Sequence, residues 1–198
     1  MGVEERMADR CNTIRLYSFQ TDVVYQVLKR DGVCYSKEEY VRKKYKESAK
    51  VFINAYGWFV KEAQHIVPKP EGAEYPYWAF TDLYNVDQTG DGHVLTLDVP
   101  IGEAILFDMF DWTKIMQMHY IGENESEEAT FSEELKNMGM NEFQIMTSNS
   151  YPEQKARIQE SWKRLFGHQQ AIEAGDNSGV HSVQAGLWCI KDEWIVKE

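Results

Sequence analysis

The pattern of apolar and polar residues predicts a strand followed by a helix near the start of the chain. Residues 13–19 alternate between two faces, as side chains on a strand do. Apolar residues then recur at helical spacing over residues 23–28. Thr21 or Asp22 can cap this helix, and Gly32 can end it. We therefore expect a strand and a helix joined by a very short turn.

A longer helical pattern follows. Apolar residues step by threes and fours over residues 45–66, after a capping box formed by Ser36 and Glu39. The run stops before a proline, which cannot continue a helix. We expect this long helix to bury Phe52 and Phe59 against the rest of the protein.

The middle of the chain has the alternation of strands. Residues 77–84 are rich in aromatics, and residues 93–100 alternate with a period of two. Residues 87–92, DQTGDG, resemble a calcium loop, but a helix–loop–helix calcium site requires a helix where a strand is predicted. We interpret the loop as a β-hairpin connection in which Gly90 and Gly92 adopt positive φ, with a weak calcium site as the alternative.

The second half of the chain mixes short strands and short helices. Extended segments are predicted at residues 103–108, 143–148, 183–190 and 193–197. Helices are predicted from Asp111 to His119, from Thr130 onward, and from Pro152 to Gly167. Residues 123–129 are predicted to form an acidic surface loop.

These elements interleave without a regular βαβ repeat, which is typical of the α+β class. We expect a flexible polar tail at residues 1–12 and a single domain over residues 13–198. Its sheet should be small, mixed or antiparallel, and packed with one long and several short helices.

Charge and composition exclude several functions. The net charge of −11, from 32 acidic and 21 basic residues, disfavours nonspecific binding to nucleic acid. The chain has no apolar run long enough for a membrane span and no pairwise cysteine spacing, which predicts a cytoplasmic protein without disulfides. Basic residues cluster within residues 42–50, which leaves open a local patch for an anionic ligand.

Common catalytic and metal-binding motifs are missing from the sequence. It contains no G-x-S-x-G, no P-loop and no G-x-G-x-x-G. The five histidines show neither H-x-x-x-H nor H-E-x-x-H spacing, so no metal site is expected. Serine hydrolases, P-loop NTPases and Rossmann dehydrogenases are therefore disfavoured.

Several short motifs resemble those of a bacterial family classed only as a domain of unknown function. The motifs are Y-S-x-Q-T at residues 17–21, A-Y-x-W at 55–58, P-x-G-x-x-Y-P-x-W-A at 70–79, V-P at 99–100, D-x-x-x-W at 108–112, and Q-A-x-x-W at 184–188. Phe80 stands where the family has a further tryptophan after the third motif. The resemblance extends over nearly the whole chain.

The order of elements also resembles that of ADP-ribosyltransferases, although fold alone does not determine chemistry. This resemblance implies NAD as the cofactor and a carboxylate on the last strand, Glu193, beside the oxocarbenium-like centre that forms when nicotinamide leaves. It also implies that polar groups near the first strand hold ribose or phosphate and that aromatic residues hold the nicotinamide ring. The candidates are Arg15, Gln20, Thr21, Tyr75, Tyr77 and Trp78.

Two functions remain. In the first, the protein cleaves NAD through Glu193 and transfers ADP-ribose to a macromolecular or small-molecule acceptor. In the second, it is a non-catalytic domain whose aromatic cleft, built from residues 75–80 and 187–190, binds a protein or a small ligand. The first function gains support if Gln20, Glu193 and either Tyr77 or Trp78 surround one pocket, and it loses support if Glu193 faces open solvent.

Overall fold

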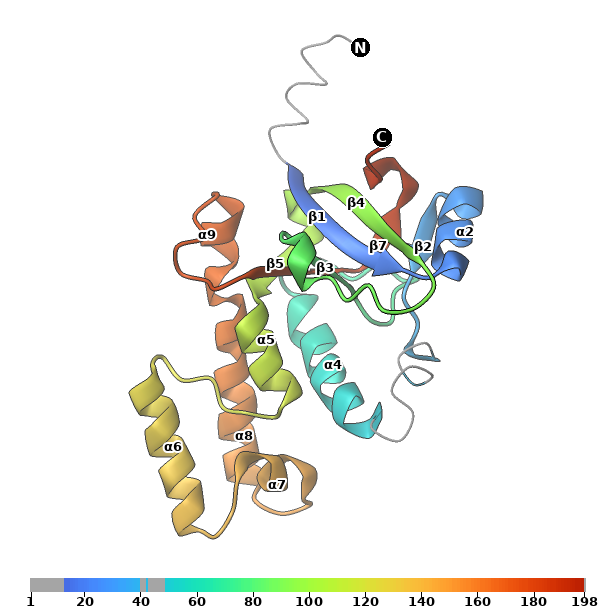
Figure 1. The fold of residues 1–198 in the computed structure, drawn as a ribbon. Helices are drawn as coiled ribbons and strands as arrows, with labels where there is room; N and C mark the ends of the chain where they lie inside the picture. The colour runs from blue at the N-terminus through green and yellow to red at the C-terminus, as the bar shows by residue number, and fades with distance from the viewer. Residues whose placement is uncertain (1–12, 40–41, 43–48, 198) are drawn as a thin grey trace.

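The protein has an α+β fold with an antiparallel sheet, as predicted (Figure 1). The computed structural model describes residues 13–39, 42 and 49–197, so the predicted N-terminal tail lies outside the described residues. Within them, five strands form one sheet in the order β4-β1-β3-β6-β5, and β2 pairs with β7 in a second sheet. The strands are β1 (Thr13–Gln20), β2 (Val33–Tyr35), β3 (Tyr77–Phe80), β4 (His93–Pro100), β5 (Ala104–Asp108), β6 (Val183–Leu187) and β7 (Cys189–Lys191).

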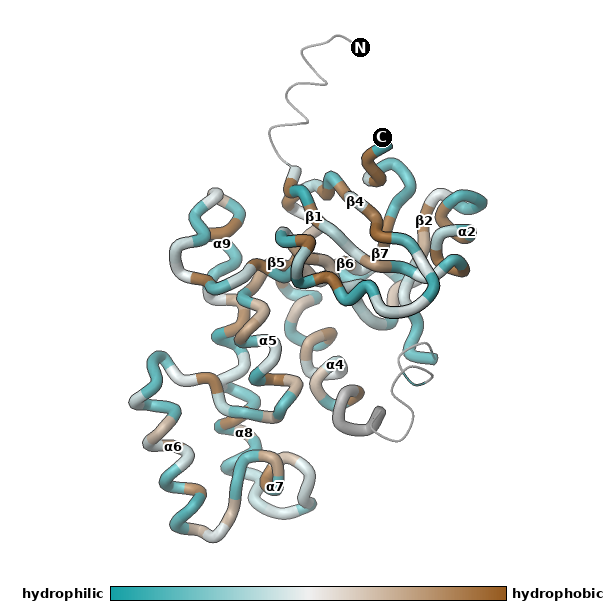
Figure 2. The backbone as a smooth tube through the Cα atoms, viewed as in Figure 1, coloured by the Kyte–Doolittle hydropathy of each residue, from teal (hydrophilic) through white to brown (hydrophobic). Residues whose placement is uncertain are grey.

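Most of the helices lie below the sheet in Figure 1, whereas α2 lies beside β2. The α-helices are α2 (Asp22–Asp31), α4 (Ala49–Ala63), α5 (Met109–Met116), α6 (Glu125–Asn137), α7 (Glu142–Thr147), α8 (Pro152–Ser161) and α9 (Gln169–Glu173). Four 3₁₀ helices are also described: η2 (Leu83–Asn85), η3 (Ile101–Glu103), η4 (Trp162–His168) and η5 (Asp192–Trp194). Figure 2 shows the mixed hydrophilic and hydrophobic colouring along α6 and α8 that is typical of helices with one buried face.

Aromatic side chains form the core between the sheet and the helices. The ring of Phe59 on α4 lies 5.1 Å from that of Trp78 and 5.3 Å from that of Trp112, measured between centroids. Phe59 is fully buried, as predicted. The side chain of Phe52 and the start of the long helix, including the region after the proposed capping box, lie outside the described residues.

The opposite face of the sheet has an aliphatic core around Leu16, Leu97 and Leu106. The β5 edge of the sheet is protected by a side chain. At β5, the buried side chain of Gln169 accepts a hydrogen bond from the backbone N–H of Leu106 at 2.5 Å and donates one to the carbonyl of Ala104 at 3.1 Å. One glutamine amide thus takes the place of a neighbouring strand.

The predicted β-hairpin is wrong, because β1 lies between β3 and β4. The strand predicted at residues 77–84 ends at Phe80, and Asp82 then caps η2 by accepting a hydrogen bond from the N–H of Tyr84. Gly90 has the predicted positive φ, of 110°. Gly92 does not, but a Cβ there would lie 2.4 Å from a carbonyl oxygen of β1, so this position still requires glycine.

Three other local predictions are also wrong. The cap of α5 is Asp108 instead of Asp111. Residues 123–129 are largely helical, because Asn124 caps α6 and the acidic residues of its first turn interact favourably with the helix dipole. Residues 143–148, predicted to be extended, lie mainly in α7, which begins with a capping box at Asn141.

The helix predicted from Pro152 is present as α8 and continues as η4 to His168, one residue beyond the predicted stop. The helical spacing predicts four inward residues: Ile158, Trp162 and Leu165 are fully buried, and Phe166 is partly buried against the same core. This buried face fixes which side of α8 and η4 is open to solvent.

Candidate functional site

The predicted catalytic residue, Glu193, does not lie on a strand. It belongs to the 3₁₀ turn η5, which follows β7, and its side chain is exposed. The neighbouring carboxylate of Asp192 is bound to Lys29 of α2 at 2.6 Å. Glu193 therefore lies on an open surface, without the enclosure that an oxocarbenium-stabilising carboxylate requires.

The polar residues predicted to bind ribose or phosphate are engaged in the sheet. Arg15 makes two hydrogen bonds to the carboxylate of Asp98 on the adjacent strand β4, at 2.5 and 3.0 Å. Gln20 donates to the hydroxyl of Ser18 at 2.8 Å. Thr21 occupies the N-cap position of α2, although its side chain makes no capping hydrogen bond.

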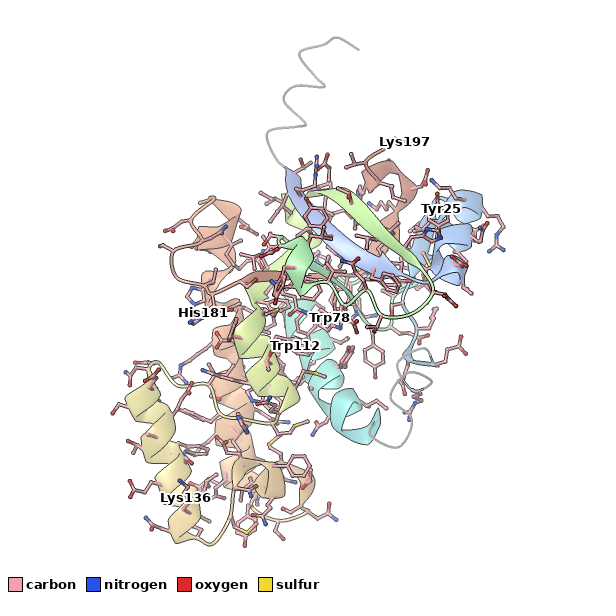
Figure 3. All side chains as sticks on the ribbon, in the orientation of Figure 1. Tyr25, Trp78, Trp112, Lys136, His181 and Lys197 are labelled. Carbon is pink, nitrogen blue, oxygen red and sulfur yellow. The ribbon has the colours of Figure 1, made fainter. Side chains whose placement is uncertain are left out.

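The predicted aromatic residues lie in the core instead of a cleft. Tyr75 and Tyr77 are buried, and the hydroxyl of Tyr77 lies 3.1 Å from the thiol of Cys34. The indole N–H of Trp78 donates to Tyr56 at 2.7 Å, and Figure 3 shows Trp78 beneath the sheet near Trp112. Tyr77 and Trp78 point to opposite faces of the sheet.

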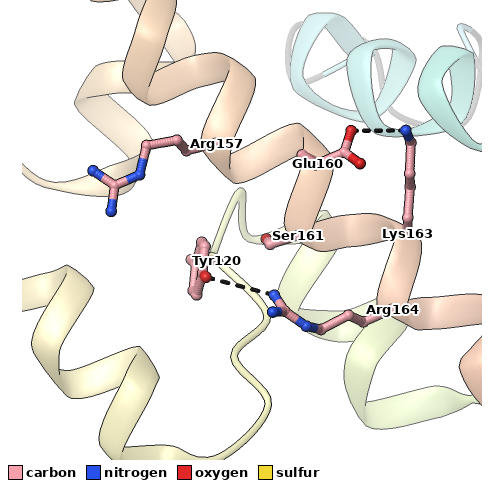
Figure 4. A pocket seen from close by; sticks show the side chains of 6 residues that line it. All are labelled: Tyr120, Arg157, Glu160, Ser161, Lys163 and Arg164. Carbon is pink, nitrogen blue, oxygen red and sulfur yellow. Dashed lines mark hydrogen bonds and ion pairs between the residues drawn. The ribbon is translucent and has the colours of Figure 1, made fainter.

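A hollow does occur on the solvent side of α8 and η4 (Figure 4). Its volume is about 540 Å³, and we call it the α8 hollow. Its lining residues are Tyr120, Arg157, Glu160, Ser161, Lys163 and Arg164. Glu160, Ser161 and Arg164 follow Arg157 by three, four and seven residues, so these four residues lie on one helix face.

The three cations of the α8 hollow differ in how tightly they are paired. Arg157 makes two hydrogen bonds to Glu134 of α6, at 2.5 and 3.0 Å. Lys163 pairs with Glu160 at 2.7 Å. Arg164 makes its shortest hydrogen bond, of 2.8 Å, to a backbone carbonyl, and its carboxylate contacts are both 3.5 Å long. Arg164 is therefore the most loosely neutralised cation of the three.

Tyr120 forms the wall opposite the helix. Its hydroxyl donates to Glu127 at 2.6 Å, and its ring stacks on Phe131 with centroids 4.4 Å apart. Burial, and then the hydrogen bond to Glu127, raises the pKa of Tyr120 above its usual value. The phenol is therefore protonated at neutral pH and adds no negative charge to the hollow.

A second polar feature is the pair formed by Asp108 and His181, of which His181 is labelled in Figure 3. The buried carboxylate of Asp108 lies 2.9 Å from Nδ1 of the exposed His181 ring and also accepts hydrogen bonds from backbone N–H groups of His181, Phe110 and Ser182. Burial raises the pKa of Asp108, but these hydrogen bonds together outweigh it and hold the pKa below its ordinary value. This carboxylate joins the start of α5 to the start of β6.

One feature of the sequence, which the motif analysis did not consider, points to the hollow. Arg157 and Arg164 are seven residues apart, opposite the apolar residues of a predicted helix, so two cations were placed on one solvent face. No such spacing predicts the contribution of Tyr120, because it precedes α6 and lies outside the helix that carries the two arginines. The basic cluster at residues 42–50 lies largely outside the described residues.

The fold and the hollow define a single α+β domain with a concave surface that is lined by three cations and by the carboxylate of Glu160. The chain belongs to the family described as Domain of unknown function (DUF3841), whose model matches residues 15–196. Searches of the curated proteins and of the solved structures each found no match. Among the described residues, no helix is both long and apolar enough to cross a membrane. Within the same residues, no three side chains of His, Cys, Asp or Glu are grouped so that they could hold a metal ion.

Proposed function

We propose that this protein is a non-catalytic binding domain that holds a small anionic ligand in the α8 hollow. The observation that carries the proposal is that Arg157 and Arg164 line one concave surface of a chain whose net charge is −11, and that both carboxylate contacts of Arg164 are 3.5 Å long. A local concentration of cations in a cleft attracts an anion even when the whole protein is acidic. The volume of about 540 Å³ is typical of small-ligand sites.

This proposal takes the binding function in preference to NAD cleavage, and it moves the site away from the aromatic segments. Cleavage of NAD requires a carboxylate close to the ribose and a surface for nicotinamide. Glu193 is exposed, whereas Tyr77 and Trp78 are committed to the two cores. These placements give no support to cleavage.

The test is a thermal-melting screen of the purified protein against small anions, neutral sugars and NAD. A ligand that binds only the folded state stabilises it by about 2.7 kcal/mol at roughly one hundred times its Kd. We expect anions, and not neutral sugars, to raise the melting temperature. The proposal is wrong if no anion does so at millimolar concentration.

The NAD samples are assayed for free nicotinamide in the same experiment. Release by the wild type, with loss of release in Glu193→Gln, would instead establish the transferase function. We expect no release above that of a sample without protein.

A further inference from the structure

We infer that the ligand of the α8 hollow carries a phosphate group and that Arg164, assisted by Arg157, is its anchor. This inference rests on the proposed function and assigns the ligand a chemical class. Figure 4 shows the guanidinium groups of Arg157 and Arg164 on either side of Tyr120. The planar guanidinium group of Arg164 suits the oxygens of phosphate, because a guanidinium group can donate two parallel hydrogen bonds.

Arg164 can exchange its present carboxylate partners for a phosphate ligand. Its contacts with Glu123 and Glu127 are 3.5 Å long, and such partly exposed pairs contribute little to stability. Glu127 also accepts hydrogen bonds from the hydroxyl of Tyr120 and the N–H of Glu123, both at 2.6 Å. Glu127 therefore stays hydrogen-bonded when Arg164 turns to a ligand.

Phosphate competes better than a carboxylate for these groups. A phosphate monoester carries a charge of about −1.5 to −2 at neutral pH and has three acceptor oxygens. Arg157 already uses Nη1 and Nη2 for Glu134, so it contributes its charge and its Nε–H. The hydroxyl of Ser161 already accepts from Ile121 and donates to Ile158, which leaves the guanidinium groups as the donors for the ligand.

Lys163 supplies a matched control within the same hollow. Its amine points away from Tyr120 toward α4 in Figure 4. The hydrogen bond to Glu160 is the main cause of the raised pKa of Lys163, and Glu62 on α4 adds to it. Removing Lys163 takes away the same charge as removing Arg164, but from a side chain that does not face the anchor.

The experiment titrates the full chain with inorganic phosphate, pyrophosphate and acetate at constant ionic strength, followed by NMR of the Tyr120 ring and of backbone amides. The variants are Arg164→Gln, Arg164→Lys and Lys163→Gln, and the melting temperature of each without ligand is measured as its baseline. We expect phosphate and pyrophosphate to bind, with affinity lowered roughly tenfold or more by Arg164→Gln and less than about threefold by Lys163→Gln. Arg164→Lys should lie between them, because it keeps the charge and loses the planar fork.

Other outcomes overturn the inference. Equal losses in Arg164→Gln and Lys163→Gln would show that only the overall charge attracts the anion. Shifts with acetate but not with phosphate would overturn the phosphate inference and leave the proposed binding of an anion intact. If none of these probes shifts the hollow and no anion in the melting screen stabilises the protein, both the inference and the proposed function fail.

Discussion

Two aromatic regions of this protein differ in what they leave for a ligand. In the core under the sheet, the rings of Phe59, Trp78 and Trp112 pack edge to face or tilted, and the indole N–H of Trp78 is bound within the protein. In the α8 hollow, Tyr120 is only half-buried and lies beside the loosely paired Arg164. The rings of the core are used up by packing. The half-buried ring beside a loosely paired cation is the arrangement on which the proposed binding surface rests.

The largest effect on stability should come from a cavity in the aromatic core under the sheet. Phe59→Ala leaves a cavity among rings that cannot easily collapse, and we expect it to cost about 3–5 kcal/mol of unfolding free energy. Phe143→Ala is the control, since Phe143 is exposed, and it should cost less than about 0.5 kcal/mol. Urea denaturation measures both, and a loss below about 1 kcal/mol for Phe59→Ala would contradict the closed core.

A smaller loss is expected at the β5 edge of the sheet, beside the aliphatic core. Gln169→Leu leaves a buried N–H of Leu106 and a buried carbonyl of Ala104 without their side-chain partner, at a cost of about 1–3 kcal/mol. The neighbouring Gln170 is exposed, so Gln170→Leu should be nearly neutral. Equal stability of the two variants in urea would show that the amide of Gln169 does not protect the edge.

Asp108 should contribute a still smaller, pH-dependent term. Asp108→Ala should cost about 0.5–2 kcal/mol at neutral pH, because it removes the cap of α5. The pKa of Asp108 is lowered on folding, so its contribution is fully present above the unfolded pKa of about 3.9 and is lost as the pH falls through the folded value. The difference in stability between wild type and Asp108→Asn should shrink below about pH 4 in acid titrations of unfolding. A difference that grows on acidification would reverse the sign of this linkage.

The smallest effect on stability is expected in the α8 hollow. Arg164→Gln removes contacts with carboxylates 3.5 Å away on a partly exposed side chain, so we expect a loss of roughly 1 kcal/mol or less. Urea denaturation of this variant provides the stability baseline for every binding experiment on the hollow. A loss as large as that of Phe59→Ala would mean that Arg164 is part of the packing and not of a binding surface.

Local patterns in the sequence predicted much of the fold. The strands β1 and β4, the end of α2 at Gly32 and the inward face of α8 all follow from periodicity and local turn chemistry. The hairpin failed because strand neighbours are determined by pairing across the chain, and β1 takes the place between β3 and β4. The helix α6 was missed because its acidic first turn has a loop-like composition, although it is stabilised by its cap and dipole.

The candidate site was much less predictable. A sequence motif drew attention to Trp78 and the order of elements to Glu193, but the packing of Trp78 against the core and the exposure of Glu193 are tertiary properties. Arg157 and Arg164 share a helix face that spacing can predict, whereas Tyr120 reaches them from more than thirty residues away. The pairing of Asp108 with His181 across 73 residues likewise depends on the neighbouring positions of β5 and β6.

The most direct test compares Arg164→Gln with Glu193→Gln in one assay. The shift in melting temperature is measured with pyrophosphate and with NAD, and free nicotinamide is measured in the NAD samples. If the hollow is the binding site, Arg164→Gln loses the pyrophosphate shift, Glu193→Gln keeps it, and no sample releases nicotinamide. Loss of the shift in Glu193→Gln with its retention in Arg164→Gln would contradict the account and place the site beside β7.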